Sequence, residues 1–141
     1  MRLFNSQTGK YVDYDKHYGR KLTAETFKSC FQVYFNNGHG IRRNAIRPMI
    51  HTITNLLHTV ENLPGYRYFS TSLLLIYEGV DQNSSYALVR MIDFAQSHFP
   101  PSPQQREACM AVTHVPGVDE GYTMGLRNLL AILNEMLGDE M

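Results

Sequence analysis

The sequence is poor in cysteine and contains no apolar run long enough to cross a bilayer. Its two cysteines, Cys30 and Cys109, have no metal-ligand spacing. Two free thiols in a reducing compartment are the simplest interpretation, since disulfides are rare there. No apolar stretch approaches the ~20 residues of a transmembrane helix. The first ten residues also lack the apolar segment of a secretory signal. We therefore expect an intracellular protein of the cytoplasm, the nucleus or both.

Several well-known nucleotide and metal motifs are absent too. The sequence contains neither the GxGxxG fingerprint nor the GxxxxGK[ST] loop, so it indicates neither a Rossmann site nor a P-loop. The histidines show no shared metal-ligand spacing. His51 and His58 share one face of an expected helix, two turns apart, and are read as surface or core residues in preference to metal ligands.

The composition is that of an ordinary globular chain, but the charges are unevenly distributed. The 141 residues, 43% of them apolar, suit one domain over 1–141. Up to Arg47 there are nine Lys/Arg and three Asp/Glu, whereas from Glu61 onward there are four and ten. A basic section of this kind suits a polyanionic ligand. A solvated surface whose charges balance after folding is the alternative. We expect no nucleic-acid partner.

The patterning predicts an α+β fold in which an antiparallel sheet is flanked by helices. Apolar residues at Phe27, Cys30, Phe31, Tyr34 and Phe35 define one helical face after an N-cap at Thr23. The run Leu73–Tyr77 is so apolar that we expect a strand buried on both faces. The expected elements are strands at 1–4, 11–14, 66–78 and 86–94, helices from 23, over 44–61 and from 122, and a long loop over 97–120.

The most informative pair is Ser72 and Asp93. If the strands around Leu74 and Met91 form a hairpin whose loop is centred between residues 82 and 83, Ser72 lies opposite Asp93. Directly opposed residues have Cβ atoms roughly 4.5–5.5 Å apart. A hydroxyl and a carboxylate at the open end of a hairpin suit Mg²⁺, which takes few protein oxygens and completes its shell with phosphates and water. An Asp that merely caps a turn after a strand is the alternative.

A second candidate is the basic segment from Asp15 to Lys21. Lys16 and Arg20 lie close to a glycine and precede a helix start, an arrangement that can bind phosphate groups. Another basic cluster, Arg42, Arg43 and Arg47, lies on the first turns of the second helix, where cations oppose the helix dipole. Solvated surface is the alternative for both clusters.

Three segments together resemble the inositol polyphosphate kinases, the family that includes inositol polyphosphate multikinase and inositol hexakisphosphate kinase. They are KHYGRKL at 16–22, YFSTSLLLIYEG at 68–79 and VRMIDFA at 89–95. The second is similar to the family's SSLL strand, with Thr71 in place of the first serine, and the third to its IDF motif. Downstream, residues 119–129 resemble the closing helix of the family. The resemblance covers nearly the whole chain and points to the family's C-terminal lobe.

The resemblance implies ATP- and Mg²⁺-dependent phosphorylation of inositol polyphosphates. It implies that Asp93, the aspartate of IDF, holds Mg²⁺ and that Ser72 lies beside the metal and the nucleotide phosphates. Lys16 and Arg20 match a basic segment near the inositol phosphate. Gln96 stands where relatives often carry a cationic or ionisable side chain, which weakens one possible contact to a substrate phosphate and leaves the choice of substrate open.

The sequence also departs from the family pattern. The PxxxDxKxG motif is absent, as is the N-terminal lobe with its ATP-binding lysine, and the chain begins at a strand that lies well inside the usual family sequence. Two functions therefore stay open. One is an inositol polyphosphate kinase, completed by an N-terminal lobe. The other is a truncated, non-catalytic module that binds inositol phosphates or proteins.

Overall fold

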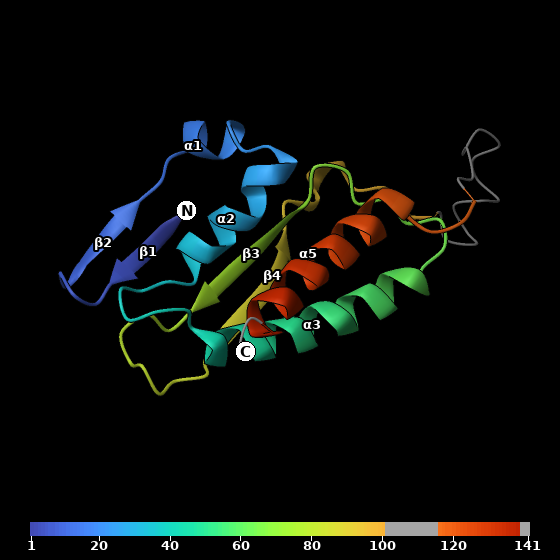
Figure 1. The fold of residues 1–141 in the computed structure, drawn as a ribbon. Coiled ribbons are helices and arrows are strands. Elements are labelled where there is room, and N and C mark those ends of the chain that lie inside the picture. Colours follow the sequence, from blue (N-terminus) through green and yellow to red (C-terminus); the bar gives the residue numbers. More distant parts are fainter. Residues whose placement is uncertain (101–115, 139–141) are drawn as a thin grey trace.

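The computed structural model describes residues 1–100 and 116–138, and the chain in these ranges folds as two packed parts (Figure 1). The N-terminal part begins with an antiparallel hairpin in which Leu3 pairs with Val12. Two helices follow, and the second begins at the predicted N-cap, Thr23, whose hydroxyl accepts from the Thr26 amide. The elements are β1 (Arg2–Asn5), β2 (Lys10–Asp13), α1 (Lys16–Arg20) and α2 (Ala24–Tyr34).

The second part holds a hairpin and two long helices. The strands pair in antiparallel fashion, with Leu75 opposite Val89. The elements are α3 (Arg43–Glu61), β3 (Ser72–Tyr77), β4 (Ala87–Ile92), the short 3₁₀ helix η1 (Phe94–Gln96) and α5 (Glu120–Gly138). The predicted α+β class is confirmed, with two separate two-stranded antiparallel sheets in the described residues.

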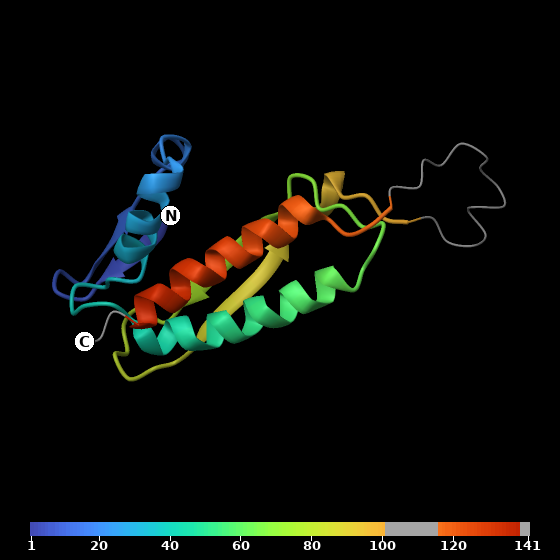
Figure 2. The ribbon, with the colours of Figure 1, turned by 45° about the vertical axis from the view of Figure 1, so that its right-hand side comes forward.

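The main core lies where α3 and α5 cover one face of the β3–β4 hairpin. Both views show the two helices side by side against that face (Figures 1 and 2). The predicted apolar stripe of α3 is confirmed, because Ile46 and Ile53 are completely buried. From α5, Leu133 joins them, and from β4, Val89. Burial of such side chains contributes roughly 1.5–3 kcal/mol each and fixes the hairpin against the helices.

Two tyrosines and an ion pair join the N-terminal part to the second part. The Tyr34 hydroxyl donates to the Leu75 carbonyl oxygen over 2.6 Å, and the Tyr77 hydroxyl donates to the Tyr34 carbonyl oxygen over 2.7 Å. Lys28 on α2 also pairs with Glu135 on α5. The tyrosine contacts attach the end of α2 to β3, and the ion pair attaches α2 to α5.

Several expectations about the second part need correction. The predicted strand over 66–78 forms only at Ser72–Tyr77, and its side chains alternate between exposed and half-buried. It is therefore not buried on both faces, because the helices cover only one of them. The long loop predicted over 97–120 ends at Asp119, and much of it lies outside the described residues, as does Cys109. Cys30 is a free thiol. None of the described helices has the length and apolar character of a membrane span.

Candidate functional site

The candidate site lies at the open end of the β3–β4 hairpin, but the strand register differs from the prediction. Ser72 lies opposite Ile92, and Asp93 is the next residue in the chain. The expected direct pairing of Ser72 with Asp93 is therefore wrong by one residue. The physical reason lies in the loop of the hairpin. The Glu78 amide donates to the Tyr86 carbonyl oxygen at the base of the loop, so the loop is centred on Gln82 and each residue of β3 pairs one position earlier in β4 than expected.

Asp93 marks a change of register between the two chain segments. Within the hairpin, the residue numbers of each opposed pair add up to 164, as they do for Ser72 and Ile92. Beyond the open end of the hairpin, Arg67 and His98 form an isolated bridge through two backbone hydrogen bonds of 2.8 Å. The residue numbers of this pair add up to 165, one more than in the hairpin. The segment after β4 thus contains one extra residue. Asp93 adopts the left-handed conformation with φ 65° and ψ 59°, which turns the chain from β4 into η1.

The Asp93 carboxylate and the Ser72 hydroxyl are both exposed and available to a ligand. Within the described residues, neither makes a hydrogen bond or an ion pair with another side chain or with the backbone. No group of three or more His, Cys, Asp or Glu side chains in the described ranges could hold a metal by itself. Carboxylate and hydroxyl oxygens are ligands that suit a hard divalent cation, which brings its own phosphates and water.

Ser70 adds a second left-handed residue to this end of the hairpin. Its φ is 57°, and Ser70 and Asp93 are the two non-glycine residues with positive φ among the described residues. The Ser70 hydroxyl donates to Gln96 Oε1 over 3.2 Å. Left-handed conformations in residues other than glycine cost roughly 1–2 kcal/mol, and such strain is concentrated at functional sites. Gln96, predicted from the sequence, therefore belongs to the same end of the hairpin as Asp93.

Asp119 supports the segment that leads into Ser72. Its Oδ2 accepts from the Tyr68 amide over 2.9 Å, and its Oδ1 accepts from the Tyr122 amide over 3.0 Å at the start of α5. The Tyr68 and Tyr122 rings pack 4.9 Å apart. Burial raises the pKa of both phenols, so these rings are neutral at physiological pH. The segment before Ser72 is thus held to the helix that covers the hairpin.

Lys16 and Arg20 lie elsewhere in the structure. Both are exposed on α1, which begins at the N-cap Asp15. No hydrogen bond or ion pair in the described residues joins α1 to the open end of the hairpin, and the second view shows α1 and η1 well apart (Figure 2). The structure therefore groups Asp93, Ser72 and Gln96 and leaves Lys16 and Arg20 apart from them.

Sequence reasoning missed two residues of this arrangement. Asp119 carried a usable signal, because an aspartate directly before an amphipathic run is a preferred N-cap. Its second hydrogen bond, to the Tyr68 amide, had no such signal, since that contact spans 51 positions. The left-handed Ser70 also had none, because serine has no strong preference for that conformation.

An α+β domain with this arrangement of hairpin and helices matches the fold of a solved structure. The chain superimposes on the crystal structure of inositol phosphate multikinase Ipk2 from S. cerevisiae, in complex with ADP and Mn²⁺, with a TM-score of 0.69. The match covers 96% of this chain and 55% of the yeast chain at 24% identity, which establishes the fold.

Sequence comparison then gives the family. The family model described as inositol polyphosphate kinase matches residues 1–134. The chain therefore belongs to the inositol polyphosphate kinase family, and the resemblance drawn from its motifs is confirmed.

The most similar relatives include inositol hexakisphosphate kinases. Inositol hexakisphosphate kinase 3 of Mus musculus is 29% identical over 150 residues, which cover 96% of this chain and 36% of the relative. Inositol hexakisphosphate kinase 1 of Mus musculus is 29% identical over 172 residues, covering 96% of this chain and 38% of the relative. The chain thus spans little more than a third of the length of these relatives.

Proposed function

We propose that this chain supplies the metal- and phosphate-binding end of an inositol polyphosphate kinase, which transfers the γ-phosphoryl group of ATP to an inositol phosphate. The observation that carries the proposal is the Asp93 carboxylate, held in a left-handed turn, exposed and without a protein partner in the described residues. Family membership supports it, as do the names of relatives, which are inositol hexakisphosphate kinases.

Asp93 would hold Mg²⁺, and Ser72 would add a hydroxyl oxygen beside it. When bound, the metal neutralises charge on the nucleotide phosphates. Phosphoryl transfer requires little covalent chemistry from a protein, so catalysis consists mostly of positioning and charge stabilisation. The role proposed for this chain is therefore to position the metal ion and the phosphates. The left-handed Asp93 fixes where its carboxylate lies, and the core under β4 keeps that position rigid.

Gln96 is the proposed contact to the substrate within this group. Its side-chain oxygen accepts from the Ser70 hydroxyl, and its amide nitrogen, which has no partner among the described residues, would donate to a phosphate. A neutral amide binds a phosphate less strongly than a cation does, because charge-assisted hydrogen bonds are roughly twice as strong. Lys16 and Arg20 remain proposed substrate residues, and their role would require a substrate or a further segment to extend from α1 toward the hairpin.

A non-catalytic module is the second candidate, and one observation favours it. In the described residues no Lys or Arg side chain forms an ion pair with Asp93, whereas phosphoryl transfer needs cationic groups around the phosphates. In this case the chain would bind an inositol phosphate or a protein without turning over ATP.

A titration and a turnover assay on the same chain separate the two candidates. The chain is titrated with ADP in the presence and absence of Mg²⁺, and phosphate transfer from ATP to inositol hexakisphosphate is measured. Metal-dependent nucleotide binding that is lost in Asp93→Asn supports the kinase site, whether or not the chain alone turns over. Inositol phosphate binding without metal-dependent nucleotide binding supports the module.

A further inference from the structure

The basic cluster at the start of α3 lines a pocket that the proposed kinase site does not use. The pocket has a volume of about 290 Å³, and its lining includes His39, Arg42, Arg43, Asn44, Arg47 and Gln82. Figure 1 shows the start of α3 beside the loop between β3 and β4, at the end of the strands opposite η1. No Asp or Glu lines the pocket in the part of the chain that the structure describes. The pocket is therefore rich in cations and lies away from Asp93.

Arg42 is a buried cation without a carboxylate partner. Only 4% of the residue is exposed. Its Nη2 donates to the carbonyl oxygens of Asp81 over 2.7 Å and Ser84 over 3.1 Å, whereas Nη1 is buried and has no hydrogen-bond partner among the described residues. None of the ion pairs between described residues includes Arg42. A buried charge is costly unless it is paired, so an anion in the pocket that Arg42 lines would compensate this charge.

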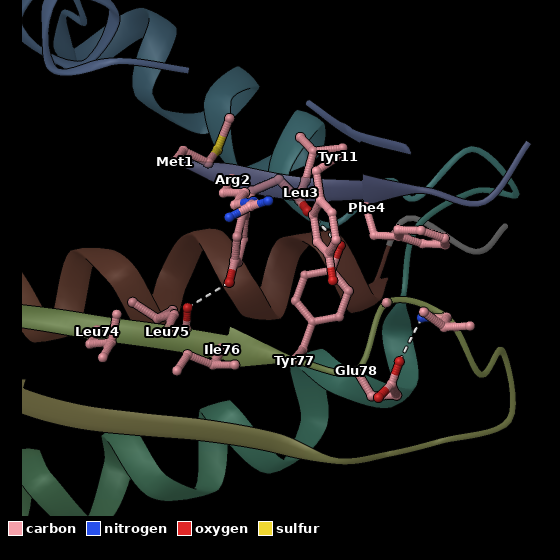
Figure 3. Close-up of a pocket in the computed structure, with 13 residues that line it drawn as sticks. Met1, Arg2, Leu3, Phe4, Tyr11, Leu74, Leu75, Ile76, Tyr77 and Glu78 are labelled. Carbon is pink, nitrogen blue, oxygen red and sulfur yellow. Dashed lines mark hydrogen bonds between the residues drawn. The ribbon is translucent and has the colours of Figure 1, made fainter. Parts of the chain in front are cut away.

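The acidic side chains of the adjoining loop do not compensate it. The loop between β3 and β4 has two of them, Glu78 and Asp81. Glu78 Oε1 accepts from the Val80 amide over 2.6 Å, which is the dashed line beside Glu78 in Figure 3. Asp81 Oδ1 accepts from the Asn83 amide over 2.9 Å. Neither carboxylate forms an ion pair within residues 1–100 and 116–138. Both are used inside the loop, and neither neutralises Arg42.

The first turn of α3 adds an unused donor and the positive end of a helix dipole. The helix has 19 residues, its N-cap Arg42 makes no side-chain cap hydrogen bond, and its first turn contains no acidic residue. The other first-turn amides bond to the carbonyls of Ile41 and Arg42, but the Asn44 amide has no partner among the described residues. Arg47 is exposed, and its side chain makes no ion pair or hydrogen bond in the same ranges. Cations at this end oppose the dipole, whereas an anion is stabilised by it.

We propose that this pocket is a second anion-binding site, which takes a phosphate group of a ligand that carries phosphomonoesters. The Asn44 amide and the Arg47 guanidinium would donate to phosphate oxygens, and the buried Arg42 would supply fixed positive charge. Several cations without an acid favour a doubly charged phosphate over a single carboxylate. Because no carboxylate lines the pocket to hold a metal, binding would not require Mg²⁺. The inference uses none of the residues around Asp93, so it does not depend on the proposed kinase activity.

The test titrates the complete chain with inorganic phosphate in the absence of Mg²⁺. Backbone amide signals of the isotope-labelled chain are followed by NMR, with sodium chloride at equal ionic strength as the blank. Arg47→Gln removes one cation from an exposed position of the pocket. Arg90→Gln is the matched control, since Arg90 is exposed on β4 and does not line the pocket. Urea unfolding of both variants verifies that the fold is retained.

We expect phosphate to shift the signals of residues 39–47 and Gln82 in the unmodified chain. Affinity should fall at least about fivefold in Arg47→Gln, because a charge-assisted hydrogen bond is lost, and should be unchanged in Arg90→Gln. No shift around residues 39–47 beyond that of the chloride blank would overturn the proposal. An equal affinity in the two variants would also overturn it, because the general charge of the chain would then account for binding.

A second titration, again without Mg²⁺, distinguishes two sources of such a phosphate group. Soluble inositol trisphosphate is compared with phosphatidylcholine vesicles that contain phosphatidylinositol bisphosphate, a lipid whose headgroup carries phosphomonoesters. Binding of the soluble compound that weakens in Arg47→Gln assigns the site to a soluble ligand. Binding confined to the vesicles, with the same loss in the variant, assigns it to a lipid headgroup. Binding of neither, or binding that Arg47→Gln leaves unchanged, contradicts a phosphomonoester site at the start of α3.

Discussion

Ser72 lies directly opposite Ile92, so Asp93 is the first residue beyond the paired strands. This one-residue offset decides how the site is built. A directly paired aspartate would share the regular strand conformation of its neighbours. Instead, Asp93 occupies a left-handed turn, and its carboxylate is placed by the change of register between the hairpin and the Arg67–His98 bridge.

Asp93→Asn should remove metal-dependent nucleotide binding and leave the fold intact. Asparagine tolerates the left-handed conformation about as well as aspartate, and the side chain is exposed. We expect affinity for ADP with Mg²⁺ to fall at least about tenfold and the free energy of unfolding to change by less than about 0.5 kcal/mol. Calorimetric titration and urea unfolding measure the two quantities. Asp81→Asn, in the loop at the closed end of the hairpin, keeps an oxygen acceptor for the Asn83 amide and is the matched control, which should leave the affinity for ADP unchanged.

Asp93→Gly and Asp93→Ala should separate strain from ligand binding. Both lack the carboxylate, so both should lose the metal-dependent binding. Glycine adopts positive φ without steric cost, whereas alanine pays about 1–2 kcal/mol for the left-handed conformation. The Gly variant should therefore unfold at a higher urea concentration than the Ala variant. Equal midpoints for the two variants would show that position 93 is not held in a left-handed turn.

Asp119→Ala should destabilise the chain by about 2–3 kcal/mol, because an N-cap contributes about 1 kcal/mol and a hydrogen bond to a charged group about 1.5 kcal/mol or more. Asp119→Asn keeps one acceptor for the Tyr122 amide, so its loss of stability should be roughly half that of Asp119→Ala. Chemical unfolding gives both values. Glu120→Ala, an exposed neighbour in the first turn, is the control. A loss no larger than that of the control would contradict the role assigned to Asp119.

Stability should decrease at high pH because of two half-buried tyrosines. Burial raises the pKa of Tyr34 and Tyr77 above the ordinary value of 10.0. A group that binds its proton more tightly in the folded state contributes stability fully below its unfolded pKa and loses it as the pH rises toward its folded pKa. Unfolding free energy should thus be insensitive to these groups below about pH 10 and fall above it. Tyr34→Phe should flatten that decrease, measured by urea unfolding from pH 8 to 11.

The secondary structure was largely accessible from the sequence, and the contacts between elements were not. The stripe that includes Ile46 and Ile53 predicted α3, and Thr23 predicted the start of α2, because helix periodicity and capping are local properties. The hairpin register was missed because side chains shape its loop. Glu78 Oε1 accepts from the Val80 amide over 2.6 Å, and Asp81 Oδ1 accepts from the Asn83 amide over 2.9 Å. Placing the turn at the midpoint between two expected strands takes no account of such bonds.

The residues of the candidate site were named from the sequence and their role stays a prediction, whereas the contacts that support them were not foreseen. The motif around Asp93 and the strand that begins at Ser72 were visible in the sequence, and both lie at the open end of the hairpin. The left-handed backbone of Ser70 and the link from Asp119 to the Tyr68 amide depend on chain segments far apart in sequence. The half-exposed character of β3 could not be predicted either, because an apolar run does not reveal which face a helix covers.

The most direct test of the central claim locates a bound divalent ion by paramagnetic broadening. Mn²⁺ with ADP is added to the isotope-labelled chain, and NMR signals of the backbone amides are recorded for the unmodified chain and for Asp93→Asn. The account predicts broadening centred on residues 70–73 and 92–96 that disappears in the variant. Broadening centred elsewhere, or unchanged by the substitution, would contradict a metal site at the open end of the hairpin.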